Sequence, residues 1–227
     1  MIKIENWSVM NFENAIRGMR NPMNSWARID SGYDENGNYI IGENDMKLMK
    51  TLCRAGSDDR KFMRMIFVTV DVTAPLYWWK EFDTYKVGTV ANSCSTMHKI
   101  ADKEFTLEDF SHEHLLSMAN NDAGDALFLN DANNIRVDGD DLLGLIINVL
   151  NYYRGRYIKT KDKRYWWQLI QLLPSSYNQR RTVMLNYEVL ANIYKSRRNH
   201  KLDEWHTFCD WIESLPYSKL ITGEKKG

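Results

Sequence analysis

Hydrophobic and polar positions alternate most clearly along residues 64–72, RMIFVTVDV, where Ile66, Val68, Val70 and Val72 occupy every second place. A period of two residues is typical of a β-strand whose two faces meet different surroundings. This segment is therefore the clearest predicted strand of the chain.

A helix that carries an aromatic stripe is predicted directly after this strand. Thr73 is a suitable N-cap, and Pro75 fits the first helical turn, where its missing backbone N–H costs nothing. Trp78, Phe82 and Tyr85 follow at spacings of four and three residues, which places them on one helix face. Most of this stripe is expected to lie in the core.

A period near 3.6 residues dominates the C-terminal half of the chain. It predicts helices over residues 140–157, 162–173, 180–200 and 203–214. Clusters of Gly, Asn and Asp predict a hairpin or loop over residues 31–45 and a loop-rich connection over residues 120–141. The fold class is therefore α+β and rich in helix, and the absence of repeats and long linkers predicts a single domain over residues 1–227.

Composition and charge then narrow the class of protein. No segment has the roughly 20 consecutive apolar residues of a membrane span, and the first residues lack the apolar core of a signal peptide. Lys and Arg together number 30, as do Asp and Glu, so no overall field attracts nucleic acid or anionic lipid. We expect a cytoplasmic protein with no membrane and no nucleic-acid partner.

No metal site is predicted from the spacing of possible ligands. The three cysteines have no CxxC spacing, which argues against a structural zinc site and a disulfide framework. His112 and His114 lie at what reads as a helix start, where their side chains would diverge. A calcium loop that begins at Asp131 would need Gly in its sixth position, where the chain has Arg136.

The chain also lacks the common catalytic motifs. Cys94 has only His98 as a nearby base, so it is expected to be a small packing residue and not a nucleophile. No GxGxxG, Walker loop or GxSxG elbow is present, which argues against the commonest dinucleotide, NTPase and hydrolase sites.

The predicted helix over residues 180–200 carries the most informative side chains. At about 100° per residue, Asn186, Leu190, Ile193 and Arg197 fall on one face, with the amide and the guanidinium about 16 Å apart along the axis. That distance is roughly the length of a nucleotide. The alternative is that Arg197 reaches along the surface to solvent and that Asn186 caps the helix or bonds to backbone.

A stretch with little side-chain bulk follows Lys86, and basic residues surround the helix just described. These basic residues are Arg180, Arg181, Arg197, Arg198 and His200. If the two segments approach each other, Arg side chains, loop N–H groups and Ser or Thr hydroxyls can hold a phosphate or a carboxylate. The alternative is a solvated charged face that nearby acidic residues neutralise.

These segments together resemble the flavin-dependent thymidylate synthases, the ThyX family. The resemblance is carried by TYKVGTVANSCSTM (84–97) after a strand and an aromatic helix, by the turn LLPSSYNQ (172–179), and by NYEVLANIYKSRRNHKLDEW (186–205). It covers most of residues 60–210 and implies a ThyX-like fold with a small antiparallel sheet. It also implies a homotetramer whose active sites combine several subunits.

The resemblance also implies roles for single residues. It places cofactor contacts on Lys86, Thr89, Asn92, Asn186, Asn192 and His200, and substrate contacts on Lys86, Ser93, Ser95 and Arg197. Arg180 and Arg181 are further candidates for substrate binding. Basic groups of the family signature are replaced by Thr84, Tyr85 and Met97, and Glu188 stands where the family has Arg.

The implied reaction is the reductive methylation of dUMP or a related pyrimidine nucleotide. It uses FAD as cofactor, with methylenetetrahydrofolate and NADPH as co-substrates, and needs no covalent protein nucleophile. The replaced basic groups leave two alternatives: a nucleotide-binding ThyX-like protein that has lost or changed the methyl transfer, and a structural protein that keeps only the fold.

Overall fold

The structure is a computed structural model that describes residues 2–117, 127–130 and 135–223. Contacts within the chain divide it into two compact units. Unit 1 contains Thr73–Glu81 and Ser93–Arg180, and unit 2 contains Ile2–Val72, Phe82–Asn92 and Arg181–Gly227.

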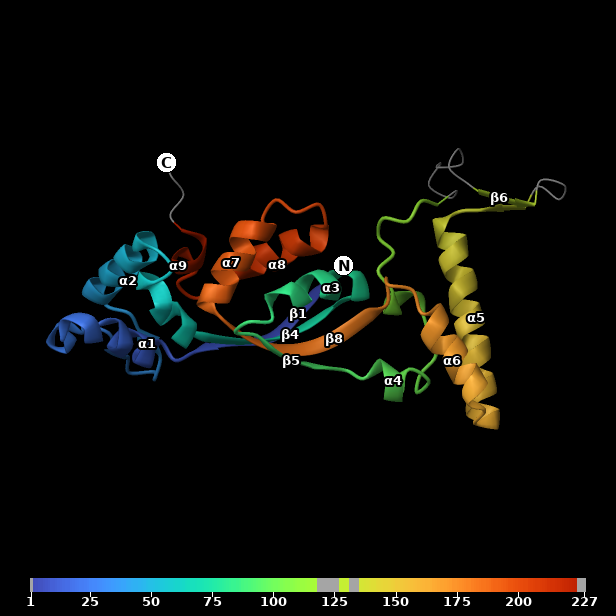
Figure 1. The fold of residues 1–227 in the computed structure, drawn as a ribbon, viewed down its shortest axis with the longest axis horizontal. Helices are drawn as coiled ribbons and strands as arrows, with labels where there is room; N and C mark the ends of the chain where they lie inside the picture. Colours follow the sequence, from blue (N-terminus) through green and yellow to red (C-terminus); the bar gives the residue numbers. More distant parts are fainter. Residues whose placement is uncertain (1, 118–126, 131–134, 224–227) are drawn as a thin grey trace. The chain divides into compact units, whose positions relative to one another are not determined.

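The main sheet has four strands in the order β1–β4–β8–β5 (Figure 1). They are β1 (Lys3–Met10), β4 (Phe67–Pro75), β8 (Asn178–Asn186) and β5 (Val90–Ser93). The N–H of Tyr187 donates to the carbonyl of Ile66, and the N–H of Leu76 donates to that of Tyr177, so β4 and β8 run in opposite directions. A small antiparallel sheet with a mostly helical remainder confirms the predicted α+β class.

Strand β4 has the predicted alternation, but it begins and ends three residues later than the predicted segment 64–72. Val68, Val70 and Val72 are fully buried, and Ala74 continues the same buried face. The prediction that Thr73 starts a helix is therefore wrong, because the buried face of the sheet extends through residue 74. The aromatic helix α3 begins one residue after the strand, as Leu76–Phe82.

The single helix predicted over residues 180–200 is also wrong, because its first part is strand β8. Val183 and Leu185 are buried while Met184 is exposed, which is the alternation of a strand. The hydroxyl of Thr182 donates to Oδ1 of Asp71 at 2.6 Å, a bond between β8 and β4. The helix itself, α7, spans Tyr187–Arg197.

The other long helices agree with their predictions. These are α5 (Gly139–Thr160), α6 (Lys163–Leu172) and α8 (Asp203–Ser214). Figure 1 shows α5 beside α6 in unit 1, and α7 and α8 on the same side of the strands in unit 2. The core of unit 1 consists of Ile100, Phe105, Phe110, Leu143, Leu150 and Leu169.

Besides β1, several elements of unit 2 were not predicted from the sequence, and most of them lie in its N-terminal part. They are α1 (Phe12–Met19), the 3-10 helices η1 (Asn21–Met23), η2 (Trp26–Arg28) and η3 (Asp59–Met65), α2 (Glu43–Ala55), and near the C-terminus α9 (Lys219–Thr222). The hairpin predicted over residues 31–45 is confirmed, since β2 (Gly32–Tyr33) pairs with β3 (Tyr39–Ile40).

Several short elements lie between α3 and α5. They are η4 (Asp83–Tyr85), α4 (Thr96–Lys99), η5 (Leu107–Asp109), and β6 (Leu127–Asn130), which pairs with β7 (Ile135–Val137). The predicted connection over residues 120–141 therefore contains a hairpin in its described part, whereas Asp131 and most of its neighbours lie outside the described residues. His112 and His114 lie in an irregular turn and not at the predicted helix start.

A buried polar network fixes the start of α2. Asp45 is fully buried, and its Oδ1 accepts from Nε of Arg20 at 2.6 Å while its Oδ2 accepts from the hydroxyl of Ser31 at 2.7 Å. Asp30 accepts from the N–H groups of residues 44 and 45 in the first turn of α2, which lowers its pKa. A Cβ on Gly42 would lie 2.3 Å from the Asp30 side chain, so this position requires glycine.

Candidate ligand-binding site

The loop after Lys86 lies directly against the N-terminus of helix α7. Gly88 has φ of +80°, and a Cβ there would lie 3.2 Å from Nδ2 of Asn186 and 3.2 Å from Cγ2 of Val189. Glycine is therefore required both by the left-handed backbone and by the close approach of the helix. The low bulk of this stretch has a physical cause within one subunit, namely the contact between the loop and α7.

Two buried polar side chains lie at this contact, and they differ in whether they have a hydrogen-bond partner. Asn186 is buried and caps α7, because its Oδ1 accepts from the N–H of Val189 at 3.0 Å. The hydroxyl oxygen of Thr89 is buried and has no hydrogen-bond partner among the residues that the structure describes. A buried hydroxyl without a partner is costly, and a ligand atom at this position would satisfy it.

Arg197 lies between two aromatic rings near the other end of α7. Its Nε donates to the hydroxyl of Tyr85 at 2.9 Å, and its guanidinium carbon lies 5.6 Å from the Tyr85 ring centroid and 4.9 Å from that of Trp205. These cation–π contacts hold the guanidinium plane in a defined orientation. Arg197 is half-buried here and does not extend freely into solvent.

Tyr85 therefore joins the loop to Arg197. Tyr85 directly precedes Lys86 in the chain, and Arg197 lies 112 positions after Tyr85. The structure thus brings the Lys86 loop and Arg197 to opposite ends of the same helix within one subunit. From the sequence, Tyr85 is expected on the aromatic stripe and in place of a basic group of the family signature, and neither expectation connects it with Arg197.

Two further charges of this region are neutralised by partners within unit 2. Arg181 pairs with Asp83 at 2.9 Å. Glu188 is buried and pairs with Arg60 at 3.0 Å, and Arg60 also lies 3.5 Å from the side-chain oxygen of Asn192. The acidic residue at position 188 therefore has a basic partner from η3, which the sequence analysis missed because Arg60 lies 128 positions earlier.

The remaining predicted residues have simpler environments. In unit 2, Lys86 and Asn92 are exposed, and Nδ1 of His200 accepts from the N–H of Leu202 at 3.2 Å. In unit 1, Ser93 and Arg180 are exposed.

Ser95 and Cys94 have local roles in unit 1. The hydroxyl of Ser95 caps the short helix α4 by accepting from the N–H of His98 at 3.2 Å. Cys94 is exposed, which contradicts its prediction as a packing residue, although its backbone N–H donates to the carbonyl of Arg180 at 2.9 Å.

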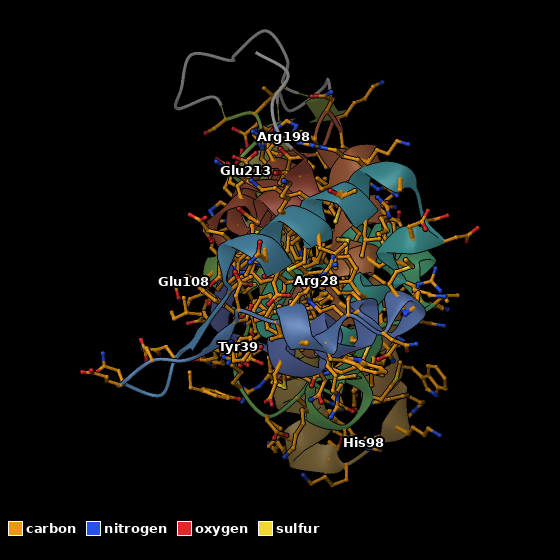
Figure 2. All side chains as sticks on the ribbon, turned by 90° about the vertical axis from the view of Figure 1, so that its left-hand side faces the viewer. Arg28, Tyr39, His98, Glu108, Arg198 and Glu213 are labelled. Atoms are coloured by element: carbon orange, nitrogen blue, oxygen red, sulfur yellow. The ribbon has the colours of Figure 1, made fainter. Side chains whose placement is uncertain are left out.

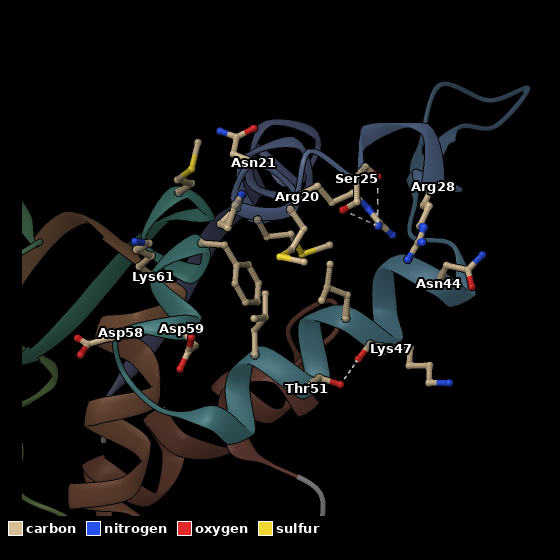
Figure 3. A pocket seen from close by; sticks show the side chains of 18 of the residues that line it. Arg20, Asn21, Ser25, Arg28, Asn44, Lys47, Thr51, Asp58, Asp59 and Lys61 are labelled. Carbon is tan, nitrogen blue, oxygen red and sulfur yellow. Dashed lines mark hydrogen bonds between the residues drawn. The ribbon is translucent and has the colours of Figure 1, made fainter.

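A large cavity of about 1320 Å³ lies elsewhere in unit 2, between α1, α2 and η3 (Figure 3). Apolar side chains such as Leu48 and Phe62 line it together with basic ones such as Lys47 and Lys61. None of the site residues predicted from the sequence lines this cavity. The sequence did not predict this cavity, because the helices that form its walls were not predicted either.

Two other kinds of feature, a membrane span and a metal site, are not found in the part of the chain that the structure describes. Within residues 2–117, 127–130 and 135–223, no helix is both long and apolar enough to span a bilayer. In the same ranges, no group of three or more His, Cys, Asp or Glu side chains is placed to hold a metal ion.

Comparison with solved structures identifies the fold. The chain is similar to a crystal structure of thymidylate synthase X (ThyX) from Helicobacter pylori with FAD and dUMP, with a TM-score of 0.62, 13% identity, and coverage of 97% of this chain and 96% of that one. It is also similar to the UMP/dUMP methylase PolB from Streptomyces cacaoi bound with 5-Br UMP, with a TM-score of 0.57, 15% identity, and coverage of 94% and 88%.

Sequence comparison alone finds nothing of this kind. No protein-family model matches the chain, and no curated protein matches its sequence. The similarity is thus found by comparing backbones, at an identity of 13–15%. The resemblance found in the sequence is confirmed at this level: the chain has the ThyX fold over nearly its whole length.

Proposed function

We propose that this chain is a divergent flavin-dependent thymidylate synthase that methylates dUMP or a related pyrimidine nucleotide. The observation that carries the proposal is the buried hydroxyl of Thr89, which has no hydrogen-bond partner among the described residues and follows directly after Gly88, where the loop lies against the N-terminus of α7. The similar structures support this choice of ligands, because the ThyX structure holds FAD and dUMP and the PolB structure holds 5-Br UMP.

The side chains around the loop fit a flavin and a nucleotide in part. The Thr89 hydroxyl and the exposed amide of Asn192 would hold the cofactor, and Arg197 would contact the pyrimidine ring. When bound, FAD supplies the hydride, methylenetetrahydrofolate the one-carbon unit and NADPH the electrons. The residues of this chain then serve to orient the stacked rings and to hold the nucleotide in place.

Arg197 is well suited to recognise a pyrimidine edge. Its guanidinium is oriented by Tyr85 and Trp205 before any ligand arrives, so little side-chain entropy is lost on binding. A guanidinium is permanently charged and stabilises negative charge that develops on a nearby ring oxygen or nitrogen. Lys86 is exposed one residue after Tyr85 and is the candidate partner of the nucleotide phosphate.

The direct test is an activity assay on the purified protein. With FAD, NADPH and methylenetetrahydrofolate present, the enzyme is expected to release tritium from C5 of labelled dUMP. Arg197→Met should abolish the release, while Lys159→Met, a change at an exposed position of α5, should leave it unchanged. Absence of release with dUMP and with UMP, from protein that binds FAD, would contradict the proposed reaction.

A nucleotide-binding protein without methyl transfer is the second candidate. It is favoured by two neutralised charges: Arg181, a candidate for substrate binding, pairs with Asp83, and Glu188, which stands where the family has Arg, pairs with Arg60. In this case dUMP raises the melting temperature of the protein without any turnover. A ligand present at 100 times its Kd would stabilise the protein by about 2.7 kcal/mol.

The proposal extends to assembly and location. We infer that residues 1–227 form one ThyX-like domain, and that the chain works in the cytoplasm as a homotetramer with sites that combine several subunits. Ser93, Ser95 and Arg180 would then contribute to substrate binding, and Asn92 and His200 to cofactor binding, in the assembled protein. Sedimentation velocity tests the assembly, since a species of four chains is expected at micromolar concentration.

A further inference from the structure

A second cavity in unit 2 has a strongly cationic lining. It has a volume of about 440 Å³ and lies between α2, η3, α7 and α9. Among the described residues, six basic side chains and no acidic one line it: Lys50, Arg54, Arg60, Lys195, Arg198 and Lys219. A lining rich in basic groups gives the cavity a positive potential that favours the binding of an anion.

Carboxylates outside the lining hold two of these side chains in place. Arg198 pairs with Asp210 at 2.7 Å and with Glu213 at 3.3 Å, and Figure 2 shows Arg198 beside Glu213. Arg60 pairs with Glu188 at 3.0 Å. These pairs fix both guanidinium groups on the cavity wall, as a preorganised anion site requires.

The two lysines on the other walls have no such partner. Lys195 comes from α7 and Lys219 from α9, and both are exposed. In the part of the chain that the structure describes, neither ammonium group has an ion-pair or hydrogen-bond partner. The cavity therefore keeps positive charge that the protein itself does not neutralise.

The remaining lining residues are suited to an organic body. Ala191, Leu220 and Ile221 are buried and apolar, and the ring of Tyr194 lies 5.8 Å from the guanidinium carbon of Arg198. The volume falls within the range of about 300–1,000 Å³ that small-molecule pockets occupy. A cationic lining with an apolar wall fits a phosphorylated small molecule better than a bare ion.

This cavity adjoins the site at the Gly88 loop along α7. At about 100° per residue, Ala191 and Lys195 point to one side of α7, whereas Val189 and Arg197 point roughly to the opposite side. Asn192, a proposed cofactor contact, also lines the cavity, so the two sites share this residue and differ in the rest of their lining.

We propose that this cavity binds a small molecule with two or more phosphate groups, such as a nucleoside triphosphate. The test uses isothermal titration of the full chain with inorganic tripolyphosphate and with dUTP, at 150 mM salt. Both probes are expected to bind the wild type with one site per chain. The charge reversals Lys195→Glu and Lys219→Glu together should weaken both probes at least ten-fold.

A matched control and a milder variant distinguish a loss of binding at this cavity from a general effect of charge or a loss of folding. Lys159→Glu, at an exposed position of α5, should leave both affinities unchanged, and Lys195→Gln with Lys219→Gln should weaken binding while preserving the melting temperature. Equal affinity in the wild type and the glutamine variant would overturn the proposal. It would also be overturned by binding only to anionic lipid vesicles or to duplex DNA, with none to the two phosphate probes.

Discussion

Replacing Asp45 with alanine is expected to destabilise unit 2 strongly, because the change leaves a buried guanidinium without its carboxylate. Arg20 is 4% exposed and Asp45 is fully buried, and the two charges are 2.6 Å apart. The second oxygen of Asp45 also accepts from the N–H of Asp30 at 3.1 Å and from the N–H and hydroxyl of Ser31 at 3.1 and 2.7 Å. Asp45→Ala removes the ion pair and all three of these hydrogen bonds at once.

Removing one partner of a buried ion pair costs about 3–5 kcal/mol, and we expect Asp45→Ala to lower the free energy of unfolding by that amount. Adding Arg20→Met should recover part of the loss, because the unpaired charge is then gone and an apolar chain fills its place. The free energy is obtained from urea unfolding followed by far-UV circular dichroism at pH 7, with the denaturant slope unchanged.

An exposed ion pair of similar length provides the control. Lys99 and Asp102 are 2.8 Å apart, with side chains 73% and 55% exposed. Asp102→Ala is expected to cost less than about 1 kcal/mol, since solvent screens exposed pairs. If Asp45→Ala cost no more than Asp102→Ala, or if the double variant were as unstable as the sum of its parts, the reasoning about burial would be refuted.

Three smaller predictions concern single side chains. Tyr85→Phe removes the acceptor of Arg197 Nε and should weaken dUMP binding about ten-fold in calorimetry, with little change in melting temperature; an unchanged affinity would contradict this. Gly42→Ala forces a Cβ to within 2.3 Å of a neighbouring carboxylate and should cost about 1–3 kcal/mol in urea unfolding; a cost near zero would count against the crowding. Burial raises the pKa of Cys209 to about 11 from an ordinary value of 9.0, so at pH 8 its thiol should react with Ellman's reagent far more slowly than the exposed Cys94. The stability that the neutral Cys209 thiol contributes is present below about pH 9 and is lost as the pH rises towards 11, so Cys209→Ala should reduce the loss of unfolding free energy over that interval.

Strong and regular patterns predicted their elements well. Strand β4 was found because its valines alternate over many residues, and α8 was found with both of its ends. Strand β8 was missed because its short alternation joins directly to the period of α7, so that the two read as one helix. What defines β8 is its pairing with β4, as in the bond from Thr182 to Asp71, which lies 111 positions away.

The N-terminal helices show a different kind of omission. The buried residues of α1 are Phe12, Ala15, Ile16 and Met19, a spacing of three and four that indicates an amphipathic helix. This signal was available in the sequence. The large cavity between α1 and α2 follows only from the packing of those helices, so it had no signature of its own.

The candidate site was predictable as a set of segments and not as a set of contacts. The stretch after Lys86 and the helix with Arg197 were both identified from residue types. The need for glycine at position 88 depends on Asn186 and Val189, which are far away in the sequence. In the same way, the partner of Arg197 is Tyr85, and residue types alone do not show that pair.

The central claim is that the Gly88 loop and α7 form a flavin site, and titration with FAD tests it most directly. The wild type is expected to bind FAD and to show a bound-flavin absorbance band after gel filtration, while Gly88→Val should lose it. Gly37→Val is the matched control, because Gly37 has φ of +79° and nothing within 4 Å, so it shares the backbone strain without the crowding. Wild-type protein that stays colourless at saturating FAD, or equal loss in both variants, would contradict the account.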